Sequence, residues 1–236
     1  TKFTAELYAS FGFVILISIL LDIGAQLNIW RIITASEKRA PDIANQIFPG
    51  LGYLLSALIV IGGIAFNVGN IAGCGMGLNV LFGIDIKTGA AISAVIAIAI
   101  FWVKDAGVAM DWFAKILGFI MIGLTVYVAF TSNPPLADAL VKSFVPDKIN
   151  ITTIVTIVGG TVGGYITFAG AHRLLDANIK GIDAIPKVSR SAVTAIGLAS
   201  VMRILLFLAA LGVVLQGVTL NPDNPAATVF QTAAGN

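Results

Sequence analysis

Long apolar stretches are the feature that most constrains this chain. A helix needs about 20 apolar residues to cross the hydrocarbon core of a bilayer. Six stretches of roughly that kind occur, the third being short: 11–34, 49–73, 88–103, 108–131, 151–175 and 191–217. In lipid, a helix satisfies its backbone hydrogen bonds internally. We therefore predict an all-α fold, a polytopic transmembrane helical bundle that forms a single transmembrane domain over residues 1–236.

The composition excludes several classes of protein. Hydrophobic residues make up 58% of the chain and charged residues 11%, whereas a soluble domain carries about a quarter charged residues. A net charge of +2 without a basic run argues against nucleic-acid binding. The sequence has no phosphate-binding loop, Gly-x-Ser-x-Gly or His-Glu-x-x-His motif. We expect no enzyme activity, no resident cofactor and no obligate protein partner, with the lipid bilayer as the surroundings.

Lys and Arg are distributed unequally between the two sides of the predicted bundle. One side receives Arg31, Lys38, Arg39, Lys104, Lys115, Arg173, Lys180, Lys187 and Arg190. The other receives Lys87, Lys142 and Lys148, with Lys2 near it. The positive-inside rule makes the first side cytoplasmic. The chain also starts at Thr1 without a methionine, so we expect a fragment of an integral, multi-pass protein of the bacterial cytoplasmic membrane.

Turn residues separate the apolar stretches. Residues 37–41 predict a polar turn, Lys104-Asp105 a very tight one, and Asn133-Pro134-Pro135 the end of a helix. Residues 136–150 predict a loop of mixed charge with a short surface helix.

A few ionisable or polar side chains fall within the spans. Asp22 and Gln26 lie one helical turn apart, His172 and Asp176 do so at the end of the fifth span, and Arg203 is well inside the sixth. Intramembrane ionisable residues are functional candidates, although buried charges also simply pair to fix helix packing. His172 is the only histidine. It is a candidate proton relay, or else makes a structural hydrogen bond.

The second span combines small residues with two amides. Gly62-Gly63, Gly69 and Gly73 favour close helix packing. Asn67 and Asn70 either take part in that packing or present amide oxygens to a transport pathway.

The fifth span is the richest in glycine. Five glycines occur within residues 159–170, and each weakens a helix by close to 1 kcal/mol relative to alanine. The span is therefore predicted to unwind in its middle. Secondary transporters build ion sites at such broken helices. The alternative is a continuous helix with a glycine face for packing.

The same span resembles helix six of the NRAMP superfamily of divalent-metal transporters. The resemblance rests on Thr161–Asn178, together with 28–31, 66–73 and 221–225, and it is strongest to the bacterial branch that includes magnesium transporters. It implies a LeuT-type fold of two inverted repeats, with this chain covering about helix 1b to helix 7. On that alignment Lys2 lies at or beside the position of a helix-one asparagine ligand.

The resemblance also implies a metal site, with informative departures. Gly164 aligns with the family's Ala, Thr167 with its Met, and Phe168-Ala169 with its Pro-His. Ala169 thus lacks the titratable ring that the family's usual proton symport uses. A hydroxyl and a backbone carbonyl suit a hard ion such as Mg²⁺, whereas a thioether suits softer metals. Gly164 and Thr167 are the expected metal-binding residues, and Tyr165 and Phe168 are expected pathway neighbours.

These expectations combine into one function and two rivals. We expect alternating-access transport of a divalent cation, Mg²⁺ or Mn²⁺, with Asp22, Asn67, Asn70 and His172 as further pathway residues. One rival is a transporter of an organic solute such as an amino acid, which also uses a broken helix. The other is a non-transporting membrane scaffold in which the glycines only pack helices.

Overall fold

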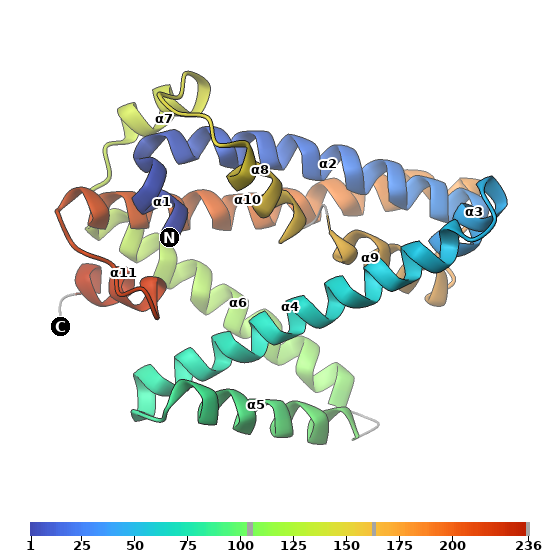
Figure 1. Cartoon of the computed structure of the whole chain (residues 1–236), viewed down its shortest axis with the longest axis horizontal. Helices are drawn as coiled ribbons and strands as arrows, with labels where there is room; N and C mark the ends of the chain where they lie inside the picture. The colour runs from blue at the N-terminus through green and yellow to red at the C-terminus, as the bar shows by residue number, and fades with distance from the viewer. Residues whose placement is uncertain (103–105, 162–163, 235–236) are drawn as a thin grey trace. The chain divides into compact units, whose positions relative to one another are not determined.

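The computed structural model describes residues 1–102, 106–161 and 164–234, and every regular element in these ranges is helical (Figure 1). The helices are α1 (Lys2–Leu7), η1 (Tyr8–Ser10), α2 (Phe11–Ser36), α3 (Ala40–Ile47), α4 (Leu51–Phe82), α5 (Ile86–Phe101), α6 (Ala106–Thr131), α7 (Leu136–Phe144), α8 (Ile151–Gly159), α9 (Tyr165–Asp176), η2 (Ile182–Ala184), α10 (Ile185–Leu215) and α11 (Pro225–Ala234). The predicted all-α class is confirmed.

Helix lengths agree with a polytopic membrane bundle. Within the described residues, four helical segments are long and apolar enough to cross a membrane: Lys2–Ser36, Leu51–Phe82, Trp112–Thr131 and Ile182–Leu215. Ile86–Ile100 is a shorter apolar helix. Five of the six predicted spans are continuous helices, and the fifth is divided into α8 and α9. The predicted turn at Lys104 and Asp105 lies outside the described residues.

Two of the turns between helices use a glycine or an asparagine in left-handed backbone. Gly83, which lies between α4 and α5, has φ +68°. Asp85 then caps α5, because its side chain accepts hydrogen bonds from the amides of Lys87 and Thr88. Asn178, just after α9, has φ 58°, and asparagine is among the non-glycine residues that adopt this conformation most readily. Gly83 and Asn178 thus let the chain turn after α4 and after α9.

The helices divide into two compact units. The first comprises Thr1–Tyr8, Phe66–Ala139 and Leu205–Asn236, and the second comprises Ala9–Ala65 and Leu140–Ile204. In the first unit, α11 packs on α6 around a buried apolar core. That core contains Val128, Ala129, Ala209, Ala210, Val213 and Val229. Sequence reasoning did not anticipate α11, although Pro225 at its first position is a common helix start.

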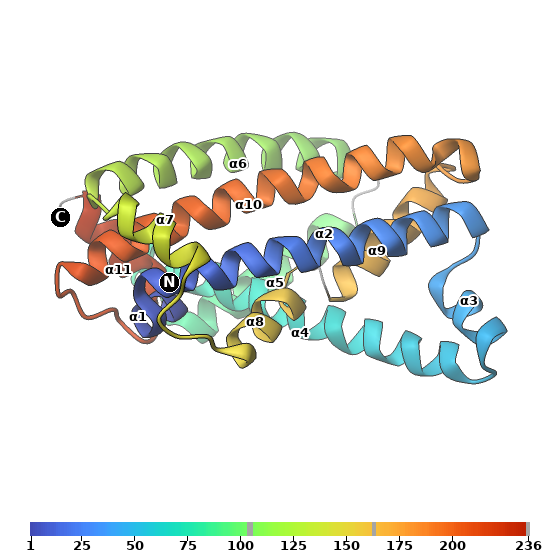
Figure 2. The same cartoon turned by 90° about the horizontal axis from the view of Figure 1, so that it is seen from above.

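The second unit is organised around α2. Both α8 and α9 pack along this helix (Figure 1). The part of α10 in this unit runs beside α2, as Figure 2 shows, and a hydrogen bond from Arg31 to Ser189 joins the two helices. A small apolar core of Ile33, Ala40 and Ala171 holds α2, α3 and α9 together. This unit contains the broken fifth span, so it carries the candidate site.

Candidate metal site at the broken helix

The fifth span is broken in its middle, as its glycines predicted. α8 ends at Gly159 and α9 begins at Tyr165, so Gly160, Thr161 and Gly164 lie between two separate helices (Figure 1). Gly163, another member of the glycine run, lies outside the described residues. The end of α8 presents backbone carbonyls, and a helix C-terminus carries partial negative charge. This end of the break therefore favours a cation, whereas the N-terminus of α9 at the other end carries partial positive charge.

Gly164 occupies a position that a larger residue would not fit. A Cβ built on it would run into the backbone carbonyl oxygen of Gly159. Its own carbonyl oxygen accepts the amide of Thr167 at 3.3 Å. Gly164 thus lies directly against the last residue of α8, and the absence of a side chain at Gly164 permits that approach.

Thr167 lies in the first turn of α9 and is fully buried. Its carbonyl oxygen accepts a hydrogen bond of 2.8 Å from the indole nitrogen of Trp30 on α2. The structure therefore places both predicted metal-binding residues, Gly164 and Thr167, at the start of α9. Their role as metal ligands stays a prediction.

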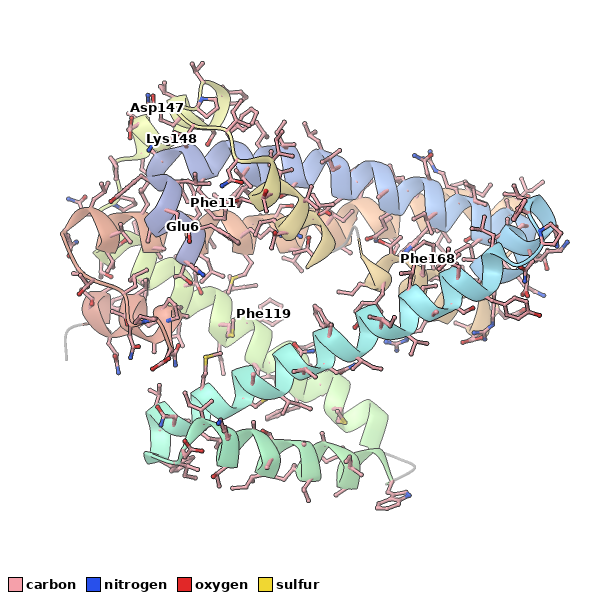
Figure 3. The ribbon with its side chains drawn as sticks, in the orientation of Figure 1. Glu6, Phe11, Phe119, Asp147, Lys148 and Phe168 are labelled. Carbon is pink, nitrogen blue, oxygen red and sulfur yellow. The ribbon has the colours of Figure 1, made fainter. Side chains whose placement is uncertain are left out.

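The two expected pathway neighbours flank Thr167. Tyr165 packs against the glycine pair of α4, and a Cβ on Gly62 would lie 3.1 Å from the Tyr165 Cβ. Phe168, labelled in Figure 3, lies on α9 and packs against the small core of Ile33, Ala40 and Ala171. The expectation that the glycines of the second span admit a close neighbour thus holds at Gly62.

Asp22 forms a buried ion pair beside the break. Its Oδ2 lies 2.7 Å from Nη1 of Arg203, and the two side chains are 0% and 17% exposed. Arg203 Nη1 also lies 3.4 Å from Ser18 Oγ. The hydroxyl of Thr161, inside the break, lies 3.3 Å from the same carboxylate oxygen and 2.6 Å from the carbonyl of Ile157. This geometry agrees with the alternative that Asp22 and Arg203 pair to fix helix packing. A role for Asp22 in the transport pathway stays a prediction.

His172 makes a structural contact at the end of α3. Its Nε2 accepts the backbone amide of Ala40 at 3.1 Å, so the imidazole caps the first turn of that helix. Arg39, the preceding residue, forms an exposed ion pair of 2.7 Å with Asp176. These contacts agree with the alternative that His172 makes a structural hydrogen bond. A role for His172 as a proton relay stays a prediction.

Asn67 and Asn70 belong to the first unit. Both are exposed positions on the portion of α4 that begins at Phe66. Their proposed place on a transport pathway remains a prediction.

The predicted ligands Gly164 and Thr167 offer uncharged oxygen. Among the described residues, no group of three or more His, Cys, Asp or Glu is placed to hold a metal ion. The oxygen atoms at the break include the backbone carbonyl of Gly164, and the carboxylate of Asp22, paired with Arg203, lies beside the break. Such donors fit a hard cation.

Sequence reasoning missed Trp30 as a residue of the site. A signal was present, because Asp22, Gln26 and Trp30 are spaced by four residues and so lie on one face of α2. Asp22 and Gln26 are buried on that face, and Trp30 makes the hydrogen bond to α9.

Comparison with known proteins assigns the chain to a family. The family model described as natural resistance-associated macrophage protein-like (Nramp) matches residues 9–234. An uncharacterized membrane protein of Haemophilus influenzae is 63% identical over 234 residues, which cover 99% of this chain and 59% of the relative. The uncharacterized membrane protein YcsG of Bacillus subtilis is also 63% identical, over 99% of this chain and 58% of the relative. The chain thus spans about three fifths of these relatives, and it belongs to the Nramp family of membrane metal-ion transporters.

Proposed function

We propose that the whole protein moves a divalent metal cation across a bacterial cytoplasmic membrane by alternating access, and that the cation binds at the break between α8 and α9. The observation that carries this proposal is the break itself, which brings the C-terminal end of α8 next to Gly164 and the first turn of α9. Secondary transporters use unwound backbone and half-helix ends in this way to coordinate cations. Membership of a metal-transporting family adds to it.

The two predicted ligands include no soft sulfur that would favour Mn²⁺ over Mg²⁺. The carbonyl of Gly164 and the hydroxyl of Thr167 are hard oxygen ligands, and neither residue supplies a soft sulfur. Mg²⁺ retains several of its waters and needs only a few protein oxygens. The lack of a three-residue carboxylate or imidazole cluster among the described residues is compatible with such a site. Tyr165 and Phe168 are then the neighbours that line the approach to the ion.

Uptake by the full-length protein in liposomes tests the proposal. Mg²⁺ and Mn²⁺ influx would be measured separately for the wild type, Thr167→Met and Thr167→Ser. The methionine variant exchanges a hydroxyl for a thioether, so we expect its preference to shift toward Mn²⁺ by about tenfold, equivalent to ~1.4 kcal/mol. The serine variant keeps the hydroxyl and should retain the preference for Mg²⁺.

Two outcomes would contradict the proposal. If the wild type transports neither ion above protein-free liposomes, metal transport is wrong and an organic solute becomes the leading substrate. If the wild type transports Mg²⁺ and the methionine variant has an unchanged preference, the metal is transported without using the Thr167 side chain.

A further inference from the structure

Trp30 joins α2 to the broken span through a side-chain hydrogen bond. Its indole Nε1 donates to the carbonyl oxygen of Thr167 at 2.8 Å, joining residues 137 positions apart. A carbonyl oxygen has two lone pairs, so it can accept this bond beside its helical one. Thr167 is fully buried, and a hydrogen bond in low-dielectric surroundings is electrostatically stronger than one in water. The bond therefore fixes the first turn of α9 against α2.

Gly170 shows how closely the indole ring approaches α9. A Cβ on this glycine would lie 2.7 Å from Cζ2 of Trp30, 3.4 Å from Cε2 and 3.6 Å from Nε1. Gly170 is three residues after Thr167 and therefore on the same face of the helix. The ring rests directly on the backbone of α9, and a methyl group at position 170 would displace the ring and its N–H together.

The ring also takes part in the apolar packing between α2 and α9. Trp30 packs against the core of Ile33, Ala40 and Ala171, and Phe168 packs against the same core. Ile33 and Trp30 lie on α2, whereas Ala171 and Phe168 lie on α9, so this packing and the hydrogen bond join the same two helices. A rigid ring with a single donor then sets the position of the Thr167 backbone relative to α2.

We infer that Trp30 is a positioning residue for ion selection: its N–H holds the Thr167 carbonyl, and Gly170 permits the close approach that this bond requires. This inference rests on the proposed metal site, because Thr167 is the residue whose position it controls. Mg²⁺ demands near-ideal octahedral geometry. A looser first turn of α9 should therefore raise the KM for Mg²⁺ more than the KM for Mn²⁺.

A double-mutant comparison in the full-length protein tests the inference. Trp30→Phe removes the N–H, and Gly170→Ala displaces the ring. Each should raise the KM ratio of Mg²⁺ to Mn²⁺ by about two- to tenfold, the range expected for one hydrogen bond. The double variant should match the larger single effect, because both changes break the same bond. Gly197→Ala, at a helical position of the same unit with nothing within 4 Å of the added Cβ, serves as the matched control.

The outcomes separate this inference from the proposed function. If the wild type transports metal and both single variants keep the wild-type KM ratio, or if only the maximal rate falls, the inference is overturned and the proposed function stands. Effects that add fully in the double variant also overturn it. A wild type that transports no metal contradicts the proposed function, and with it the claim about selectivity.

An NMR measurement tests the contact without transport. The indole N–H signal of Trp30 is assigned in the full-length protein by its loss in Trp30→Phe. We expect this signal to shift strongly in Gly170→Ala and to stay in place in Gly197→Ala. An unshifted signal in Gly170→Ala would show that the ring does not rest on Gly170, which contradicts the geometry.

Discussion

Replacing Arg203 by methionine should destabilise the protein strongly. The replacement keeps much of the side-chain volume and removes the guanidinium that lies 2.7 Å from Asp22. Asp22 is 0% exposed, so its carboxylate would be left without its cation and without access to water. Breaking a buried ion pair by removing one partner costs about 3–5 kcal/mol. We expect the upper part of this range, because Asp22 has no exposed surface.

Replacing Asp22 by asparagine should cost less. Arg203 keeps 17% exposure and a second oxygen, that of Ser18, at 3.4 Å. We expect the lower end of the same range, about 3 kcal/mol. In the double variant Asp22→Asn with Arg203→Met no charge remains buried, so its loss should be smaller than that of Arg203→Met alone.

Thermal unfolding of the full-length protein in one detergent measures these differences. For a full-length protein as long as the relatives, a loss of about 4 kcal/mol corresponds to a Tm lowered by roughly 5 °C. An Arg203→Met variant with the Tm of the wild type would refute the reasoning. A double variant whose loss equals the sum of the two single losses would also refute it, since independent sites add and a pair does not.

Two further substitutions test local features of the site. Gly164→Ala should abolish uptake and reduce the yield of folded protein, because the added Cβ would run into the Gly159 carbonyl. Uptake per folded molecule and the yield of folded protein would be measured. Wild-type values for both would contradict the geometry. His172→Phe should lower stability by about 1 kcal/mol through loss of the cap on the Ala40 amide. Its Tm would be compared with that of His172→Gln, which retains an acceptor; equal losses in the two variants would show that the capping bond contributes nothing.

The helices and the break were predictable from the sequence because their causes are local. Apolar length determines a span, and the glycines around Gly164 weaken the helix where it is broken. The boundaries were less predictable. The second span was expected to end at Gly73, but α4 continues to Phe82. A Cβ at Gly75 would run into the carbonyl of Ile86 on α5. Gly75 therefore allows α4 and α5 to pack closely, although its low helix propensity alone would suggest that the helix ends there.

The partners within the site were not predictable, because they depend on tertiary structure. Asp22 and Arg203 were each recognisable as buried charges, yet 181 residues separate them along the chain. The bond between Trp30 and Thr167 similarly joins distant segments. His172 was recognisable as a titratable group, but its use as a cap for α3 depends on how α9 packs against that helix.

Location of the bound ion tests the central claim most directly. Crystals of the full-length protein grown with Mn²⁺ would be measured near the manganese absorption edge, and the anomalous difference map would place the metal. We expect a peak at the break, within ligand distance of the Gly164 carbonyl and the Thr167 hydroxyl. Adding Mg²⁺ as a competitor should weaken this peak. A peak elsewhere in the protein, with none at the break, would contradict the account.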